Sequence, residues 1–468
     1  AACSARLFAN GRDADDGVSS SLLGQLGVDA AALARGTLFG EGLADALTAH
    51  RVEREEPSAP RPPLLLFHWE AGAEHLLRPL RKNGSLALPF LGGLVARSEA
   101  IAATGIVTVP MTLKGAWEAL CGMPPALTSD FREQGSALRR ECLPRVLARC
   151  CGYHSILAKT DIQLPDVPRR VFGFSETIVA PDNEELLDRL RARLAALHAL
   201  DGQLPVLVYF YAGDAHAPYS PDRVSPGERG LAEREMEDVF LALHRRTDAV
   251  AERLASFWPP RPPPGEAWRP EHGLAIYFGD HGELLEGADA APHGNSLAPE
   301  VSRVLLAVEG RAFARRARRE APSMRRLADV FNTVAACTGL RPHGRLHVGR
   351  SLLEQPGHDR MVSFSFYRPS ELAAVHFAPP ERGGEVRSWE FLRGHEGWAV
   401  ASADANTSGA LAELKAALAR REEVNALLTR SNVHAAWLVA KLHAAAEQAK
   451  AAARALAALL LPALPGQR

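Results

Sequence analysis

Short apolar runs recur along this chain, and longer segments with helical periodicity separate them. Several runs lack polar alternation, which is typical of strands that are covered on both faces. Strands that alternate with helices form parallel sheets with crossover connections. The order of elements therefore predicts an α/β fold. The predicted strands are 64–69, 106–109, 154–158, 205–211, 274–279 and 303–308. The predicted helices are 113–121, 137–150, 184–200, 231–256 and 325–338.

Prolines and a change in composition predict the boundaries of three regions. Residues 55–63 end in closely spaced prolines that cannot continue a helix, so we expect an N-terminal extension over 1–60. The α/β pattern then occupies 61–355. Beyond it the pattern is less regular, and Ala, Leu, Lys, Arg and Glu dominate from about residue 409. We therefore expect a C-terminal region over 356–468 that is rich in helix.

Charge and apolarity limit the classes of partner. The chain has 54 Lys+Arg and 55 Asp+Glu, with a formal net charge of −1. Nucleic acids and anionic membranes attract an excess of basic residues, so we expect no nucleic-acid partner. The apolar stretch 451–465 is interrupted by Arg454 and Pro462 and is shorter than the roughly 20 residues that cross a bilayer. No transmembrane span is therefore expected. The 6 cysteines include no C-x-x-C pair and are too few for a disulfide scaffold.

Polar side chains follow the predicted strands at the point where each strand ends. The carboxyl ends of parallel strands meet at one edge of a sheet, and ligands bind in the crevice outside that edge. Carboxylates, imidazoles and a hydroxyl at one edge are the groups that a metal-assisted nucleophilic site uses. These residues are Glu70, Thr112, Asp214, His216, Asp280 and His281, with His293 further along the chain.

A hydroxyl group needs help to act as a nucleophile. The Thr112 hydroxyl reacts at neutral pH only if a base or a cation favours its ionised form. Glu70, Asp280 and His281 offer carboxylate oxygens and an imidazole nitrogen, which suit Zn²⁺ or Mn²⁺. We therefore expect one divalent-metal site formed by these three residues and Thr112.

The surroundings of Thr112 suit a tetrahedral anion. Thr112 opens the helix predicted at 113–121, where free N–H groups and the helix dipole attract negative charge. Lys114 can neutralise further charge on the anion. His216 and His293 can contact the anion, protonate a leaving group or, with Asp214, bind a second metal.

Each of these residues also has an ordinary structural interpretation. Thr112 can be a helix N-cap, which is compatible with a catalytic role. Three others are of types that are usually solvated at such positions, namely Glu70, Lys114 and His216. Asp280 and His281 lie between two glycines that allow a close backbone approach to a ligand, which favours a functional role.

Five blocks of the sequence resemble motifs of the sulfatase-like branch of the alkaline phosphatase superfamily, in the family's order. Within this branch they are most similar to lipoteichoic acid synthases and phosphoethanolamine transferases. The resemblance covers about 61–355 and implies a mostly parallel sheet flanked by helices. GDHGE, followed by HG, is the most specific match. The blocks are LLLFHWEAG, TVPMTLKGAWEALCGMPP, YFYAGDAHAPY, YFGDHGELLEG and PHGNS.

The resemblance also implies roles for residues. Thr112 matches the nucleophile and, with Glu70, Asp280 and His281, the metal-holding set. The histidines that match contacts to phosphate or to a second zinc are His216 and His293. The implied chemistry is a two-step transfer of a phosphoryl or sulfuryl group. The implied substrate is a phosphodiester or a phosphorylated headgroup of a small molecule or lipid, and the implied location is extracytoplasmic or in the secretory lumen.

Two alternative functions remain open at this stage. The first is a sulfuric ester hydrolase, but sulfatases carry C-x-P-x-R or its Ser form, whose first residue becomes formylglycine. Here Thr112, in TLKGA, occupies that position, so the aldehyde precursor is missing. The second is a catalytically inactive binding protein that keeps the sulfatase fold.

Overall fold

The computed structural model describes a large part of the chain. The expected N-terminal extension over 1–60 is described only from residue 51, and most of the region after residue 409 lies outside the described residues. The described residues are 51–78, 84–127, 129, 131–160, 171–216, 236–259, 272–285, 293–309, 324–344, 346–353, 357–367, 372–378, 386–394, 397–400, 410, 413–421 and 425.

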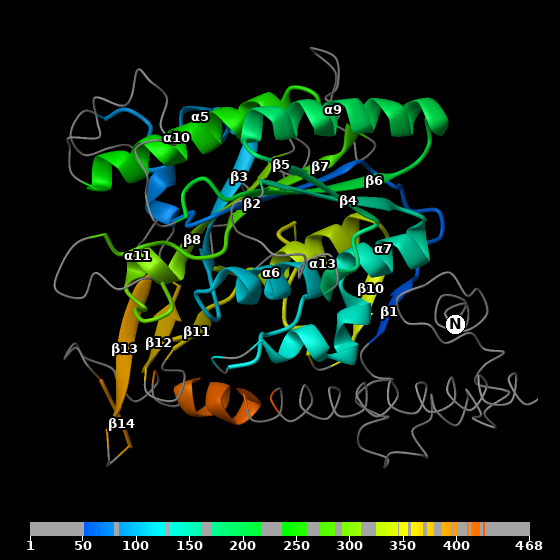
Figure 1. The fold of residues 1–468 in the computed structure, drawn as a ribbon. Coiled ribbons are helices and arrows are strands. Elements are labelled where there is room, and N and C mark those ends of the chain that lie inside the picture. Colours follow the sequence, from blue (N-terminus) through cyan, green and yellow to red (C-terminus); the bar gives the residue numbers. More distant parts are fainter. Residues whose placement is uncertain are drawn as a thin grey trace, which may run out of the picture.

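Among these residues, eight strands form one central sheet in the order β5-β4-β6-β2-β7-β8-β3-β9 (Figure 1). Neighbouring strands are parallel, except that β8 is antiparallel to β7 and to β3. The predicted, mostly parallel sheet is therefore confirmed. The strands are β2 (Leu64–Trp69), β3 (Ala100–Ile106), β4 (His154–Thr160), β5 (Glu176–Ala180), β6 (Val206–Ala212), β7 (Leu274–Gly279), β8 (Arg303–Glu309) and β9 (Arg325–Arg326).

Helices cover both faces of the sheet. Along β2, Leu64 and Leu66 belong to the core cluster under α6, α7 and α13, whereas Leu65 and Phe67 belong to the cluster under α5, α9 and α10 (Figure 1). Successive side chains of a strand point to opposite faces, so an unbroken apolar run fits a strand between two helical layers. The helices are α5 (Pro89–Ala96), α6 (Thr112–Cys121), α7 (Leu143–Cys151), α9 (Asn183–Leu200), α10 (Met236–Ala255), α11 (Pro299–Ser302) and α13 (Ala328–Cys337).

The register of the three central strands positions the candidate site. Trp69, the last residue of β2, lies level with Ala212 of β6 and with Gly279 of β7. The residues that follow these strands, including Glu70 and Asp280, therefore leave the sheet at the same edge. This register explains why residues predicted for the site lie together at one edge of the sheet.

The strand predicted at 106–109 is wrong in position. β3 ends at Ile106 and runs back to Ala100 through small residues that carry little apolar signal. Gly105 explains part of this composition, because a Cβ there would lie 2.7 Å from a methyl group of Val304 on the paired strand β8. The helix predicted at 137–150 is divided into a 3-10 helix, η3 (Ala137–Glu141), and α7.

A second, smaller unit follows the main sheet. β11 (Arg360–Phe364), β12 (Leu372–Phe377), β13 (Arg387–Gly394) and β14 (Gly397–Val400) form an antiparallel sheet. Leu414 of the helical segment 413–421 packs into its core cluster with Val375 and Phe391. The described part of 356–468 therefore contains a sheet as well as helix.

Several shorter contacts complete the fold. β1 (Arg51–Arg54) pairs with β10 (Leu340–His343), so residues before 60 join the main unit. A disulfide links Cys121, at the end of α6, to Cys142, just before α7. Two further 3-10 helices are η1 (Glu74–Leu77) and η2 (Arg132–Gly135). No helix in the described part of the chain is both long and apolar enough to span a bilayer.

Candidate metal and nucleophile site

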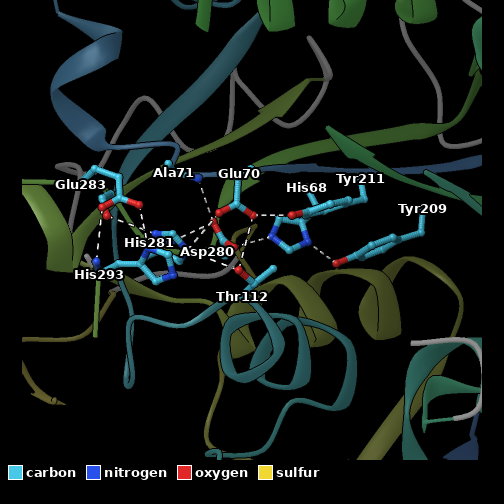
Figure 2. Close-up of polar contacts among 11 residues, drawn as sticks. His68, Glu70, Ala71, Thr112, Tyr209, Tyr211, Asp280, His281, Glu283 and His293 are labelled. Atoms are coloured by element: carbon cyan, nitrogen blue, oxygen red, sulfur yellow. Dashed lines mark hydrogen bonds and ion pairs between the residues drawn. The ribbon is translucent and has the colours of Figure 1, made fainter. Parts of the chain in front are cut away.

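Four of the predicted site residues meet at the edge of the sheet (Figure 2). Oγ1 of Thr112 lies 3.4 Å from Oε2 of Glu70 and 3.4 Å from Nε2 of His281. Nε2 of His281 lies 3.2 Å from Oε1 of Glu70 and 3.5 Å from Oδ2 of Asp280. Glu70, Asp280 and His281 are fully buried, and Thr112 is 6% exposed. The structure thus brings together all four residues expected to hold a metal.

Backbone groups hold Asp280 in place. Its Oδ1 accepts hydrogen bonds from the backbone N–H of Ala71, at 3.2 Å, and of His281, at 3.0 Å. Gly115 of α6 faces the same residue, and a Cβ there would lie 3.0 Å from Cβ of Asp280. Because Gly115 has no side chain, the first turns of α6 approach the end of β7 closely enough to bring Thr112 to the cluster.

Thr112 is the first residue of α6, and the N-cap position is occupied by Met111. No side chain caps this helix end. The interpretation of Thr112 as a structural N-cap is therefore wrong. Its hydroxyl instead contacts Glu70 and His281, as described above, at a helix end whose first N–H groups have no partner within the helix.

The unpaired atoms of the cluster fit a bound cation. Oε1 of Glu70 and Oδ2 of Asp280 are buried oxygens without an aligned hydrogen bond in the described structure. Nδ1 of His281 lies 3.1 Å from the carbonyl oxygen of Gly282, so a proton there leaves Nε2 free to bind a metal. Ligand atoms of Glu70, Asp280 and His281 all lie within 4.8 Å of one another. Two carboxylates and an imidazole suit Zn²⁺ or Mn²⁺.

The pKa values of His281 and Asp280 also indicate that the cluster favours a positive charge. Burial alone lowers the pKa of His281, but the carboxylates of Asp280 and Glu70 outweigh it and raise that pKa to about 10. Burial favours the neutral form of Asp280, yet His281 and His68 hold its pKa well below the ordinary value. The Asp280 carboxylate thus stays ionised in a buried place, which is costly unless a cation or a protonated group is beside it.

His293 extends the cluster on one side. Its ring stacks on that of His281 with centroids 3.7 Å apart, and its Nδ1 lies 2.6 Å from Oε1 of Glu283. His281, Glu283 and His293 form a second group whose ligand atoms lie within 4.8 Å of one another. The ring of His216 is 5.9 Å from that of His293. Both predicted histidines therefore lie beside the main cluster.

Asp214 and Lys114 have partners of their own. Oδ2 of Asp214 accepts a hydrogen bond from the Asn183 side chain and lies 3.7 Å from Nε of Arg246. The Lys114 ammonium is buried and lies 2.9 and 3.0 Å from the two carboxylate oxygens of Glu133. The solvated interpretations of Lys114 and of the fully buried Glu70 are wrong. The predicted roles of Lys114 and Asp214 toward an anion stay predictions.

The sequence did not indicate four polar residues beside the cluster. Tyr211 donates a hydrogen bond of 2.5 Å to Oε2 of Glu70, and Nε2 of His68 lies 3.1 Å from Oδ2 of Asp280. Tyr209 contacts His68, and Glu283 contacts His293. One signal was available for His68, because it precedes Glu70 by two residues and thus shares its side of the strand.

The fold is similar to several solved structures. The lipoteichoic acid synthase LtaP from Listeria monocytogenes has a TM-score of 0.51 and 14% identity, over 84% of this chain and 97% of that chain. Ps i-CgsB, solved with k-i-k-neocarrahexaose, has a TM-score of 0.52 and 12% identity, over 80% and 94%. A protein in the alkaline phosphatase superfamily from Vibrio parahaemolyticus has a TM-score of 0.49 and 15% identity, over 83% and 90%.

Sequence comparison adds no relative. No protein-family model matches the chain, and no curated protein sequence matches it. At these identities the similarity concerns the fold. The expectation drawn from the sequence motifs is confirmed at that level: the chain has the fold of the sulfatase-like branch of the alkaline phosphatase superfamily.

Proposed function

We propose that this protein is a metal-dependent hydrolase or transferase that acts on phosphate esters through a covalent phosphothreonine at Thr112. The observation that carries the proposal is the position of the Thr112 hydroxyl. It lies 3.4 Å from a carboxylate oxygen of Glu70 and 3.4 Å from Nε2 of His281. An alcohol at the start of a helix, beside a cluster that suits a divalent cation, has what an activated nucleophile needs.

The proposed metal ligands are Glu70, Thr112, Asp280 and His281, and the proposed ions are Zn²⁺ or Mn²⁺. When bound, such a cation favours the ionised form of a hydroxyl and stabilises charge on a phosphoryl oxygen. The two buried carboxylates give the site its negative charge and therefore its preference for a cation. The second group, which includes Glu283 and His293, is proposed to contact phosphate or to hold a second metal.

The residues of the chain position the substrate. The first N–H groups of α6, which have no acceptor within the helix, attract a phosphoryl oxygen next to the Thr112 hydroxyl. The Glu283 carboxylate accepts hydrogen bonds from Nδ1 of His293, at 2.6 Å, and from its backbone N–H, at 3.3 Å. This fixes the imidazole with Nε2 available for the substrate.

The reaction has two halves. First, the Thr112 oxygen bonds to phosphorus, the bond to the leaving oxygen breaks, and the leaving oxygen takes up the proton that the hydroxyl loses. Water or an acceptor alcohol then bonds to the phosphorus, the bond to Thr112 breaks, and the Thr112 oxygen regains a proton. Water as acceptor gives a hydrolase, and an alcohol gives a transferase.

The substrate class is proposed to be a phosphodiester or a phosphorylated headgroup. The fold similarity to a Listeria protein named as a lipoteichoic acid synthase supports an enzyme of this kind. The alternative, sulfatase chemistry, needs a formylglycine precursor, and Thr112 stands in its place. The inactive-binding alternative leaves the convergence of four metal-type ligands without a purpose.

Turnover measurements with matched variants test this proposal. Purified protein is assayed on a generic phosphodiester and an aryl sulfate, with and without chelator. We expect phosphodiester turnover that the chelator removes and that Thr112→Ala and Asp280→Asn reduce by about 10³-fold or more. Thr177→Ala, on the edge strand β5, serves as the control and should keep full activity. Dominant sulfate turnover, or full activity of Thr112→Ala, would refute the proposal.

A further inference from the structure

A group of aromatic and imidazole side chains lies beside the metal-type ligands, on the side opposite His293 (Figure 2). Its members are His68 of β2 and Tyr209 and Tyr211 of β6. Their exposed fractions are 0%, 2% and 1%. They lie inside the core, and two of them contact the carboxylates of the cluster.

His68 connects Tyr209 to Asp280. Nδ1 of His68 lies 2.5 Å from the Tyr209 hydroxyl, and its Nε2 lies 3.1 Å from Oδ2 of Asp280. Neither Nε2 of His68 nor Oδ2 of Asp280 has an aligned hydrogen bond in the described structure, so their 3.1 Å approach is an electrostatic contact. Oδ2 of Asp280 also lies 3.5 Å from Nε2 of His281.

The chemistry of these groups fixes where the protons are. An ionised carboxylate only accepts hydrogen bonds, so Nε2 of His68 must carry a proton for the approach to be favourable. In a neutral imidazole, Nδ1 is then an acceptor, and the Tyr209 hydroxyl donates to it. The Tyr209 hydroxyl therefore orients the His68 ring, and the ring holds its Nε2 3.1 Å from Oδ2 of Asp280.

Tyr211 acts on the other carboxylate. Its hydroxyl donates to Oε2 of Glu70 at 2.5 Å, which leaves Oε1 directed toward His281 at 3.2 Å. One oxygen of Glu70 is thus held by a protein donor, while the other is free for a cation. The same division applies to Asp280, whose Oδ1 is held by two backbone N–H groups.

Packing makes this group rigid. The His68 ring stacks on Phe278, with centroids 5.2 Å apart, and meets the edge of Tyr211 at 4.9 Å. Well-packed aromatic groups on adjacent strands have little freedom to rotate. The donors therefore keep their directions when the cluster gains or loses a ligand.

We propose that His68, Tyr209 and Tyr211 are positioning residues that orient Asp280 and Glu70 and thereby set the affinity of the site for a divalent cation. The proposal rests on the proposed function, since it concerns the same metal site. Some groups contact a metal ligand without binding the metal themselves. Their removal commonly lowers metal affinity by about 10- to 100-fold.

The test is calorimetric titration of chelator-treated full-length protein with Zn²⁺ alone and with Mn²⁺ alone. The variants are Tyr211→Phe and Tyr209→Phe, which remove one hydroxyl each, and His68→Leu, which removes both ring nitrogens. His68→Gln restores a donor near the position of Nε2. The control is Tyr153→Phe, because Tyr153 is a buried tyrosine whose hydroxyl donates to the carbonyl of Pro62 at the opposite end of β2.

We expect Tyr211→Phe and His68→Leu to weaken cation binding by about 10- to 100-fold, and Tyr209→Phe by less. His68→Gln should recover most of the affinity, and Tyr153→Phe should bind as the native protein does. Unfolding curves without added metal establish that each variant is folded. If His68→Leu does not fold, the nearly isosteric variant Tyr211→Phe decides the test. Equal affinities in the native protein and in Tyr211→Phe would overturn this proposal alone. Native protein that binds neither ion would overturn the proposed function, and this proposal with it.

Discussion

The buried carboxylates of this protein differ in charge because their neighbours differ. Burial favours the neutral form of Asp280, but the imidazoles of His281 and His68 outweigh burial and hold its pKa well below the ordinary value. Glu118, on α6, is equally buried, and burial raises its pKa to about 7, although Arg326 and hydrogen bonds from Thr108 oppose the shift. The effect of burial on the pKa dominates at Glu118, whereas neighbouring imidazoles outweigh it at Asp280.

Glu118 should therefore make the stability of the fold depend on pH. Its pKa in the folded state, about 7, lies above the ordinary value of 4.5, so folding favours the protonated carboxyl. Its stabilising contribution is complete below about pH 4.5 and is lost as the pH rises through about 7, a change on the order of 3 kcal/mol. We expect Glu118→Gln to gain stability relative to native protein between pH 5 and pH 8, as measured by urea unfolding.

The matched control is Glu56→Gln, because Glu56 is exposed. The difference in the free energy of unfolding between this variant and the native protein should stay nearly constant from pH 5 to pH 8. A constant difference for Glu118→Gln as well would contradict the raised pKa.

Sequence patterns predicted the metal-type ligands of the site but not the buried residues that contact these ligands. Glu70 and Asp280 were predictable because each follows an apolar strand, and strand ends collect at one edge. His68 and Tyr211 were not, since each lies within an apolar run and its partner comes from a distant part of the chain. The Lys114 ion pair with Glu133 was also missed, because a charge on a predicted helix is ordinarily solvated.

At the scale of elements, α5 depends on a side chain from another helix. No side chain caps its N-terminus from within, and Pro89 occupies its first turn. Asp248 of α10 instead accepts hydrogen bonds from the backbone N–H of Phe90, at 2.6 Å, and of Leu91, at 3.0 Å. This carboxylate satisfies two N–H groups that have no partner within the helix.

Asp248→Ala should lower the free energy of unfolding. The change leaves two backbone N–H groups at a partly buried helix end without their acceptor, which costs about 1 to 3 kcal/mol. Urea unfolding of this variant, beside Asp188→Ala on the exposed face of α9, provides the measurement. A loss no larger than that of Asp188→Ala would show that water replaces the carboxylate and that the contact is dispensable.

Elements with strong periodicity were predictable, and those defined by tertiary pairing were not. The apolar run that became β7 stands out in the sequence, and its strand was predicted at the bounds observed. The prediction for β3 was displaced because its alanines and Gly105 give little strand signal, and Gly105 packs closely on β8. The pairing of β1 with β10 depends on residues almost 300 positions apart, which no local pattern reports.

At the scale of the whole molecule, the site exists only in the folded chain. Glu70 and Asp280 directly follow β2 and β7, Thr112 begins α6, and Gly115 allows α6 to approach the end of β7. A cation that binds this arrangement binds the native state and not the unfolded chain. Binding and folding are therefore linked.

Metal removal should lower the melting temperature of the protein. At a free cation concentration of about 100 times Kd, binding adds about 2.7 kcal/mol to the free energy of unfolding. We expect Zn²⁺ or Mn²⁺ to raise Tm in a calorimetric scan, chelator to reverse the rise, and Asp280→Asn to abolish it. Asp188→Asn should keep the full effect. A Tm that does not respond to either ion would contradict metal binding at this edge of the sheet.

The central claim is that Thr112 carries the phosphoryl group during turnover. Its most direct test is to stop the reaction with acid during turnover of a phosphodiester and to locate modified residues by peptide mass spectrometry. We expect a phosphoryl group on Thr112 in native protein and none at this position in Thr112→Ala. Continued turnover with Thr112 unmodified, or with the phosphoryl group on another residue, would contradict it.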